Sequence, residues 1–85
     1  MTGEFLITDH ALRRFRERFS DPEATGYDLG VILAGMKPTR YEKRGDDDYI
    51  EAVLEDACFL LKKKGPGKYV VVTVLHAHVR NLRAS

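Results

Sequence analysis

The sequence has a single cysteine, Cys58, and no long apolar run. One cysteine can form neither an intrachain disulfide nor a cysteine-based zinc site, and its apolar neighbours predict a buried structural thiol. The longest apolar stretch, residues 69–75, is far shorter than the roughly 20 residues that cross a bilayer. We therefore expect a cytoplasmic protein with no membrane-spanning segment and no signal peptide.

The sequence also has no large excess of positive or negative charge. The formal net charge of the 85 residues is +1, which argues against binding to polyanions through bulk charge alone. The charges are nevertheless segregated along the chain. Basic residues gather in residues 13–18, 62–64 and 80–83, and acidic residues gather at 46–48 and 55–56. This distribution predicts a basic face and an acidic edge.

The chain does contain apolar residues that recur at regular spacing, and its length is that of one domain. Hydrophobic residues make up 44% and charged residues 32%, a composition typical of globular proteins. A chain of this size can bury one core. We expect residues 1–85 to form a single α+β domain, with two N-terminal helices packed on a three- to four-stranded antiparallel sheet.

Helical spacing marks the N-terminal part of the chain. Thr8 suits the N-cap of a helix that runs to about residue 19. A second helix is predicted over residues 27–36, with Gly35 and Pro38 as its stop signal. The predicted buried stripes are Leu12, Phe15 and Phe19 on the first helix and Leu29, Ile32, Leu33 and Met36 on the second.

From residue 39 the periodicity changes to two, which predicts strands joined by short turns as antiparallel neighbours. The first strand is the most polar and therefore the expected sheet edge, where pairing of two copies would give a homodimer. The last strand begins almost wholly apolar, as a central strand does, and we expect Val72 on its core face. The four predicted strands are residues 39–44, 49–54, 57–63 and 69–79.

The first helix carries a polar face. His10, Arg13, Arg14 and Glu17 stand at helical positions i, i+3, i+4 and i+7. One interpretation is a solvated face on which Glu17 pairs with Arg13 or Arg14. The other is an RNA site, because metal-free RNA cleavage needs an acid, a base and cations for the phosphate. His10 would then be the acid or base, and Arg14 with Arg13 or Arg18 would hold the phosphate.

The end of the last strand carries His76 and His78 on one face. A His-x-His pair with no carboxylate at ligand spacing is a weak metal signal. A surface role for His76, or a role as the partner of His10 across the helix–sheet junction, is favoured instead. We expect no metal and no cofactor.

A basic turn, residues 62–68, precedes the last strand. It lacks the G-x-x-x-x-G-K-[ST] pattern of a phosphate-binding loop, so ATP binding is not indicated. Its simplest interpretation is a solubilising hairpin tip. Together with the arginine helix, Lys63, Arg80 and Arg83 would instead frame a groove for a nucleic-acid backbone.

The chain also resembles a known family. The pattern H-A-x-x-R-x-x-E-R, formed by His10, Ala11, Arg14, Glu17 and Arg18, and the strand V-V-V-T-V resemble small prophage and mobile-element proteins similar to the RelE and BrnT toxins. The resemblance extends over nearly the whole chain. It implies a helical N-terminal part on an antiparallel sheet and RNA cleavage without metal. RelE-like enzymes usually carry catalytic Arg, Lys or Tyr late in the chain. Arg80 and Arg83 match this, whereas no Tyr follows Tyr69.

Two functional hypotheses follow. The first is a RelE/BrnT-like RNA-binding domain that acts as a metal-independent ribonuclease of the toxin type. The second is a non-enzymatic phage or mobile-element protein that binds and inhibits a host or defence protein, with residues 46–48, Glu51 and Glu55 mimicking phosphates. A strand-pairing oligomer without chemistry is a third alternative. For the first hypothesis the catalytic residues are His10, Arg14 and His76, with Thr73 beside them, and the RNA-binding residues are Arg13, Arg18, Lys63, Arg80 and Arg83.

Overall fold

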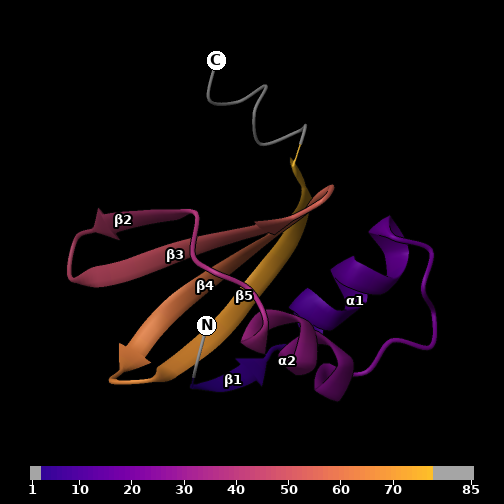
Figure 1. Cartoon of the computed structure of the whole chain (residues 1–85), viewed down its shortest axis with the longest axis horizontal. Coiled ribbons are helices and arrows are strands. Elements are labelled where there is room, and N and C mark those ends of the chain that lie inside the picture. Colours follow the sequence, from indigo (N-terminus) through magenta and orange to yellow (C-terminus); the bar gives the residue numbers. More distant parts are fainter. Residues whose placement is uncertain (1–2, 78–85) are drawn as a thin grey trace.

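The computed structural model describes residues 3–77, which form two helices and a five-stranded sheet (Figure 1). Across the sheet the strand order is β1-β5-β4-β3-β2. The α+β class is confirmed, but the prediction of a three- to four-stranded antiparallel sheet is wrong in strand number and in the direction of one pair. The elements are β1 (Glu4–Ile7), α1 (Asp9–Arg18), α2 (Gly26–Ala34), β2 (Arg40–Arg44), β3 (Asp47–Leu54), β4 (Ala57–Gly65) and β5 (Lys68–His76).

The strand missed from the sequence is β1. It lies at the sheet edge and pairs parallel with β5, with Phe5 opposite Tyr69 and their rings stacked at a centroid distance of 5.5 Å. A run of four residues is a weak period-two signal, and its partner stands at the other end of the chain. Both helices and three strands lie between β1 and β5 in the sequence, so this pairing has no local signal.

The first helix begins where it was predicted to begin. Thr8 is its N-cap, and the Thr8 Oγ1 accepts a hydrogen bond from the Ala11 amide at 3.1 Å. The same hydroxyl donates to the Val71 carbonyl of β5 at 2.8 Å. Thr8 thus contributes both to the capping of α1 and to its docking on β5.

The second helix begins one residue earlier than predicted. Thr25 and Asp28 form a capping box, in which the Thr25 hydroxyl accepts from the Asp28 amide and the Asp28 carboxylate accepts from the Thr25 amide. Gly35 is the C-cap, as expected. Within residues 3–77, neither helix is long and apolar enough to cross a membrane.

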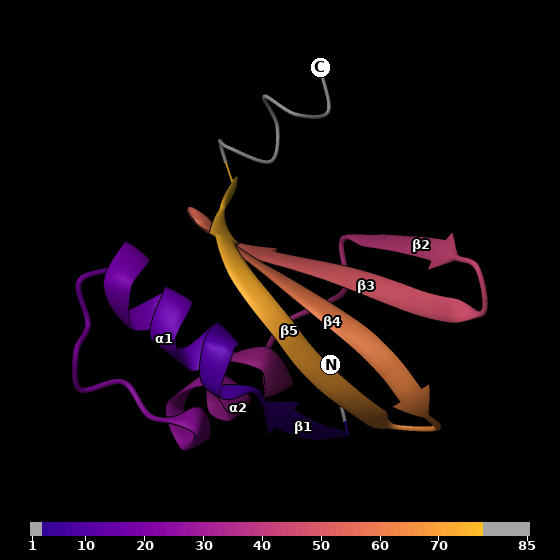
Figure 2. The ribbon, with the colours of Figure 1, turned by 180° about the vertical axis from the view of Figure 1, so that it is seen from behind.

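The core lies between the helices and one face of the sheet. Figure 2 shows both helices beside β1 and β5, with β2 and β3 toward the opposite edge of the sheet. The predicted helical stripes do face this core, and Cys58 is buried as predicted. The largest fully buried side chains in the core cluster are Phe59, Leu29, Leu33, Leu61, Val71 and Val74.

A β-bulge changes the register of β5. Leu60 lies opposite Thr73 and Leu61 lies opposite Val71, so Val72 has no counterpart on β4. Val71 and Val74 are both fully buried, although they are three positions apart. The prediction that Val72 lies on the core face is therefore wrong. The predictions of β2 as an edge strand and of β5 as an interior strand are confirmed.

We predict that Thr8→Ala lowers the free energy of unfolding by roughly 1 to 3 kcal/mol, because it removes an N-cap and a hydrogen bond to β5. Thr8→Ser is the matched control, since it keeps the hydroxyl, and it should recover most of the loss. Urea unfolding followed by circular dichroism measures both. A Thr8→Ala variant as stable as wild type would show that Thr8 does not hold α1 to β5.

Candidate functional site

The polar face of α1 exists as predicted, and part of it is neutralised. Arg14 Nη1 lies 3.1 Å from Glu17 Oε2, in an ion pair whose two side chains are substantially exposed. Such pairs contribute a few tenths of a kcal/mol. His10 and Arg13 are exposed and have no hydrogen-bond or ion-pair partner among residues 3–77. Of the three basic groups on this face, His10, Arg13 and Arg14, only the first two are therefore free of a partner among residues 3–77.

Two other arginines of α1 are engaged by backbone carbonyls. Arg16 Nε donates to the Ala24 carbonyl at 2.7 Å, which holds the loop after α1. Arg18 Nη1 donates to the Val74 carbonyl of β5 at 3.0 Å. Arg18, expected to contact phosphate, thus joins the C-terminal end of α1 to the sheet.

The structure does not bring His10 and His76 together. α1 begins beside Val71 of β5, through Thr8, and ends beside His76, through a ring contact with Phe19 at 4.8 Å. His10 stands at the first of these ends, about 13 Å along the helix axis from Phe19. Two imidazoles this far apart cannot serve as acid and base at one phosphodiester.

His76 has a different partner from the one expected. Its Nδ1 lies 2.7 Å from Asp56 Oδ2, in the turn between β3 and β4. Its ring contacts Phe19, so the imidazole joins that turn to the end of α1. Both contacts are consistent with a structural role at this corner of the fold.

The remaining predicted residues are dispersed. Thr73 lies opposite Leu60, on the face of the sheet away from Phe59 and Val74 and therefore away from α1. Lys63 lies on β4 opposite Tyr69 and is exposed. His78, Arg80 and Arg83 lie outside the described residues.

Lys63 instead borders a hollow on the part of the sheet that the helices leave uncovered. The hollow has a volume of about 430 Å³. Tyr41 stands in it with 71% of its surface exposed, and Lys43 and Asp48 lie at its rim. Among residues 3–77 neither Lys43 nor Lys63 has an ion-pair partner. The alternation of Tyr41 and Lys43 along an edge strand is a signal by which sequence reasoning could have found this surface.

The predicted acidic edge is not one surface. Residues 46–48 lie in and after the β2–β3 turn, whereas Glu55 lies at the other end of β3, about 25 Å away along the strand. Asp47 Oδ1 binds Lys62 Nζ at 3.1 Å, and this hydrogen bond raises the pKa of Lys62. Glu51 is buried. A phosphate mimic built from all of these carboxylates is therefore not present.

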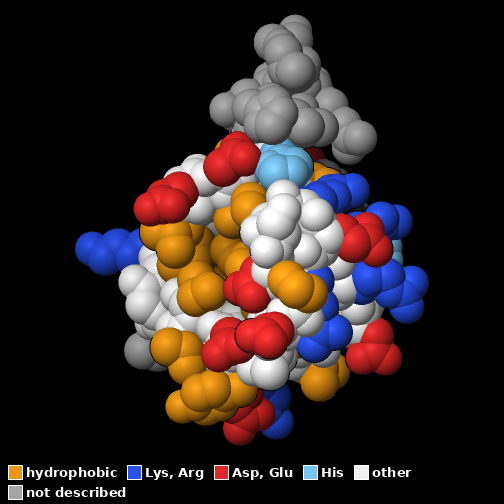
Figure 3. All heavy atoms as spheres, turned by 90° about the vertical axis from the view of Figure 1, so that its right-hand side faces the viewer, with side chains coloured by type: hydrophobic (Ala, Val, Ile, Leu, Met, Phe, Trp, Pro, Cys, Tyr) orange, Lys and Arg blue, Asp and Glu red, His pale blue; other side chains and the backbone are white. Residues whose placement is uncertain are grey.

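A second, apolar hollow lies between α1, α2 and the β3–β4 turn. Its volume is about 190 Å³, with Phe15, Phe19 and Ile32 among its lining residues and with Glu55 at its rim. Leu54, which also lines it, is 47% exposed. Figure 3, which shows this side of the molecule, has hydrophobic side chains exposed next to acidic ones, while most of the Lys and Arg side chains in this view lie toward the right-hand margin.

Neither hollow offers a metal site. Among residues 3–77, no three His, Cys, Asp or Glu side chains converge as metal ligands would. Comparison of the chain with protein-family models, with curated proteins and with solved structures finds no match. Inference about function therefore depends on the geometry of the surfaces.

We predict that Arg18→Ala lowers the free energy of unfolding by about 1 kcal/mol, because the hydrogen bond that joins α1 to β5 is lost. Arg13→Ala, on the same helix but at a residue without a partner among residues 3–77, should change the free energy of unfolding by less than about 0.5 kcal/mol. Urea unfolding of the two variants side by side measures the difference. Equal effects would mean that the Arg18–Val74 contact does not contribute to stability.

Proposed function

We propose that this domain binds single-stranded RNA in the hollow around Tyr41. The observation that carries the proposal is an exposed aromatic ring in a hollow bordered by two lysines that have no ion-pair partner in the described part of the chain. Single-stranded nucleic acids bind to surfaces of this kind, where bases stack on aromatic side chains and cations follow the backbone.

The dimensions of the hollow fit a nucleotide segment. Its volume of about 430 Å³ is within the range of small-molecule sites. Lys43 and Lys63 stand on separate strands, with β3 between them. Their ammonium groups would contact phosphates on either side of a base stacked on Tyr41.

The outer face of α1 supplies a further proposal, which depends on the resemblance to the RelE and BrnT toxins. In this proposal bound RNA is cleaved without metal, with His10 as the acid or base and with Arg13 and Arg14 on phosphate. Because His76 lies at the other end of α1 and is engaged by Asp56, we assign it no part in the chemistry. RNA binding at Tyr41 does not depend on this further step.

We predict that Tyr41→Ala weakens binding of a short labelled single-stranded RNA about 5- to 150-fold, which corresponds to one lost stacking contact of about 1 to 3 kcal/mol. Lys63→Ala should weaken it less and should lower the dependence of binding on salt by about 0.7 in log–log slope. Fluorescence anisotropy at several salt concentrations, with chelator present, measures both. Tyr27→Ala is the matched control, since Tyr27 is also an exposed tyrosine but lies on α2.

Two outcomes of this experiment count against RNA binding in the hollow. One is a wild-type protein that binds no RNA, and the other is an equal loss of affinity in Tyr41→Ala and Tyr27→Ala. Cleavage is tested separately on the same RNA. His10→Ala should reduce a metal-independent cleavage rate about 10²- to 10⁴-fold while leaving affinity unchanged. Cleavage that is unaffected by His10→Ala removes its assigned role and leaves the binding function intact.

The apolar hollow favours a second candidate function, that of a non-enzymatic inhibitor of a host or defence protein. At about 190 Å³ it is smaller than typical ligand sites and suits a single anchoring side chain. Glu55 at the rim is exposed and has no partner among residues 3–77, so it favours a basic neighbour to that anchor. We propose that the partner presents an apolar side chain flanked by Arg or Lys.

A pair of capped tripeptides tests this second function. Arg-Leu-Arg should shift the amide resonances of Phe19, Leu54 and Glu55 at millimolar concentration, because both its apolar and its basic groups match the hollow. Glu-Leu-Glu should shift them less, and Glu55→Lys should reverse the preference. Asp46→Lys is the control, since Asp46 lies in the β2–β3 turn. If neither peptide shifts these resonances, the apolar hollow is not a binding site for such a partner.

A further inference from the structure

We propose that the free edge of β1, with the groove beneath α2, is the surface through which two copies of this chain associate, β1 against β1′ in antiparallel pairing. This inference goes beyond RNA binding and does not depend on it. It also differs from the dimer predicted from the sequence, which would form through β2.

The backbone of β1 has one side available for pairing. The amides of Glu4 and Thr8 donate to carbonyls on the β5 side, at Gly67 and Val71. Backbone groups alternate in direction along a strand, so those of Phe5 and Ile7 point to the other side. β1 is the terminal strand of the sheet, and no strand among residues 3–77 lies there.

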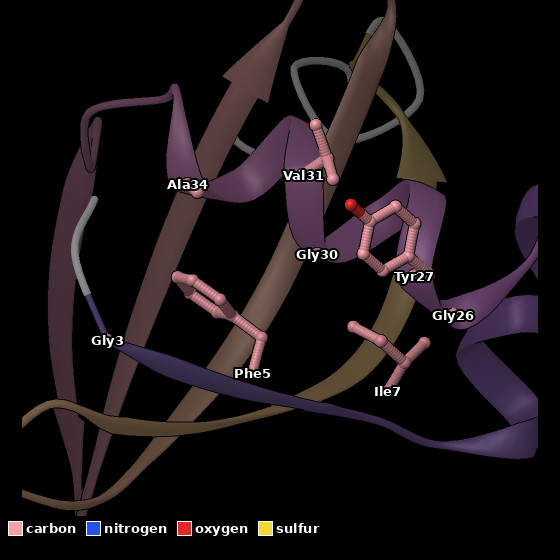
Figure 4. A pocket seen from close by; sticks show the side chains of 8 residues that line it. All are labelled: Gly3, Phe5, Ile7, Gly26, Tyr27, Gly30, Val31 and Ala34. Carbon is pink, nitrogen blue, oxygen red and sulfur yellow. The ribbon is translucent and has the colours of Figure 1, made fainter.

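An apolar groove runs along this edge. Its volume is about 490 Å³, and its walls are formed by β1 and α2 (Figure 4). Phe5 and Ile7 point into it from the strand, and Gly26, Gly30 and Ala34 line it along the helix. A Cβ at Gly30 would meet no atom within 4 Å, so space remains above the helix backbone.

Exposed hydrophobic side chains lie on α2 beside the groove and on the opposite face of β1. Tyr27 and Val31 project from α2, and Tyr27 is 81% exposed. Leu6, on the opposite face of β1 from Phe5 and Ile7, is 65% exposed. Three of the five large hydrophobic side chains exposed in residues 3–77 therefore surround one strand edge, and such clustering marks an interaction surface.

The two sheet edges differ in charge. β2 has the sequence Arg-Tyr-Glu-Lys-Arg, and charged residues on an edge strand oppose pairing. β1 has the sequence Glu-Phe-Leu-Ile, with one charged residue at its start. An apolar edge with free backbone groups is the one that favours strand addition.

A second copy of the chain can pair with the free backbone groups of this edge, because the edge is self-complementary. In a two-fold arrangement Phe5 lies opposite Ile7 of the second copy, and Ile7 lies opposite its Phe5, so that the outward backbone groups of both strands pair. Leu6 then lies opposite Leu6 of the second copy, in a non-hydrogen-bonded pair whose Cα atoms are about 4.5 Å apart. This pairing buries the one large apolar side chain on the outer face of β1.

The length of the surface limits the affinity. β1 and α2 each extend about 13 Å, from their four and nine residues. A contact of this length buries less than the roughly 800 Å² per partner of a standard interface. We therefore expect a reversible dimer with a Kd on the order of 0.1 mM.

Disulfide trapping tests the arrangement directly. Leu6→Cys places two thiols at a Cα separation within the disulfide range of about 4.4 to 6.8 Å. At about 0.1 mM protein in oxidised glutathione, this variant should form a covalent dimer at least tenfold faster than Tyr41→Cys, which exposes a thiol on the β2 edge. Cys58 is buried and common to both variants. Comparable rates, or faster trapping of Tyr41→Cys, would overturn the proposal.

Sedimentation equilibrium checks the association without a cross-link. Wild type should be a concentration-dependent dimer, and Leu6→Lys should be monomeric because like charges would face each other across the two-fold axis. Leu54→Lys, which alters an exposed leucine elsewhere, should remain dimeric. Thermal melting of dilute samples confirms that each variant is folded. A wild type that is monomeric near 1 mM, even if its β1 edge binds an apolar peptide, contradicts a second copy as the occupant.

Discussion

The Thr8 hydroxyl makes the contact on which the arrangement of the other elements depends. It caps α1 and donates to a β5 carbonyl 63 residues away in the sequence. Thr8 directly follows β1, so the same residue fixes where the parallel strand ends and where the helix begins. Arg18 attaches the other end of α1 to the same strand. With both of its ends bound to β5, α1 has little freedom to shift over the sheet, and the core stripe of α1 meets Phe59 and its neighbours.

This placement of the helices decides which surfaces remain available for binding. α1 and α2 cover the side of the sheet near β5 and β1, and the face around Tyr41 stays open. The groove between β1 and α2 opens at the opposite edge. The RNA surface that we propose and the surface for self-association thus use different edges of one sheet. The two hollows have no lining residue in common, so the two contacts do not compete for the same side chains.

Charge counts alone give a misleading picture of the helix surface. Of the arginines in residues 13–18, one is paired with Glu17 and two donate to backbone carbonyls. A guanidinium has several donors and satisfies buried carbonyls readily, so an arginine-rich helix is compatible with a mainly structural role. The lysines that border Tyr41 have no such partners among residues 3–77, which is why the proposed RNA contact moves from α1 to the sheet.

Local interactions were readable from the sequence. The Thr8 cap, the buried stripes of both helices, the buried Cys58 and the polar edge strand β2 each depend on residues a few positions apart. The tertiary structure alone decided the pairing of β1 with β5 and the bulge that turns Val72 out of the core, because each depends on partners distant in the sequence. The same reason separates His10 from His76 and places Lys63 and Tyr41 around one hollow. Helix and strand periods predict which face a residue occupies, whereas the packing of elements determines which faces meet.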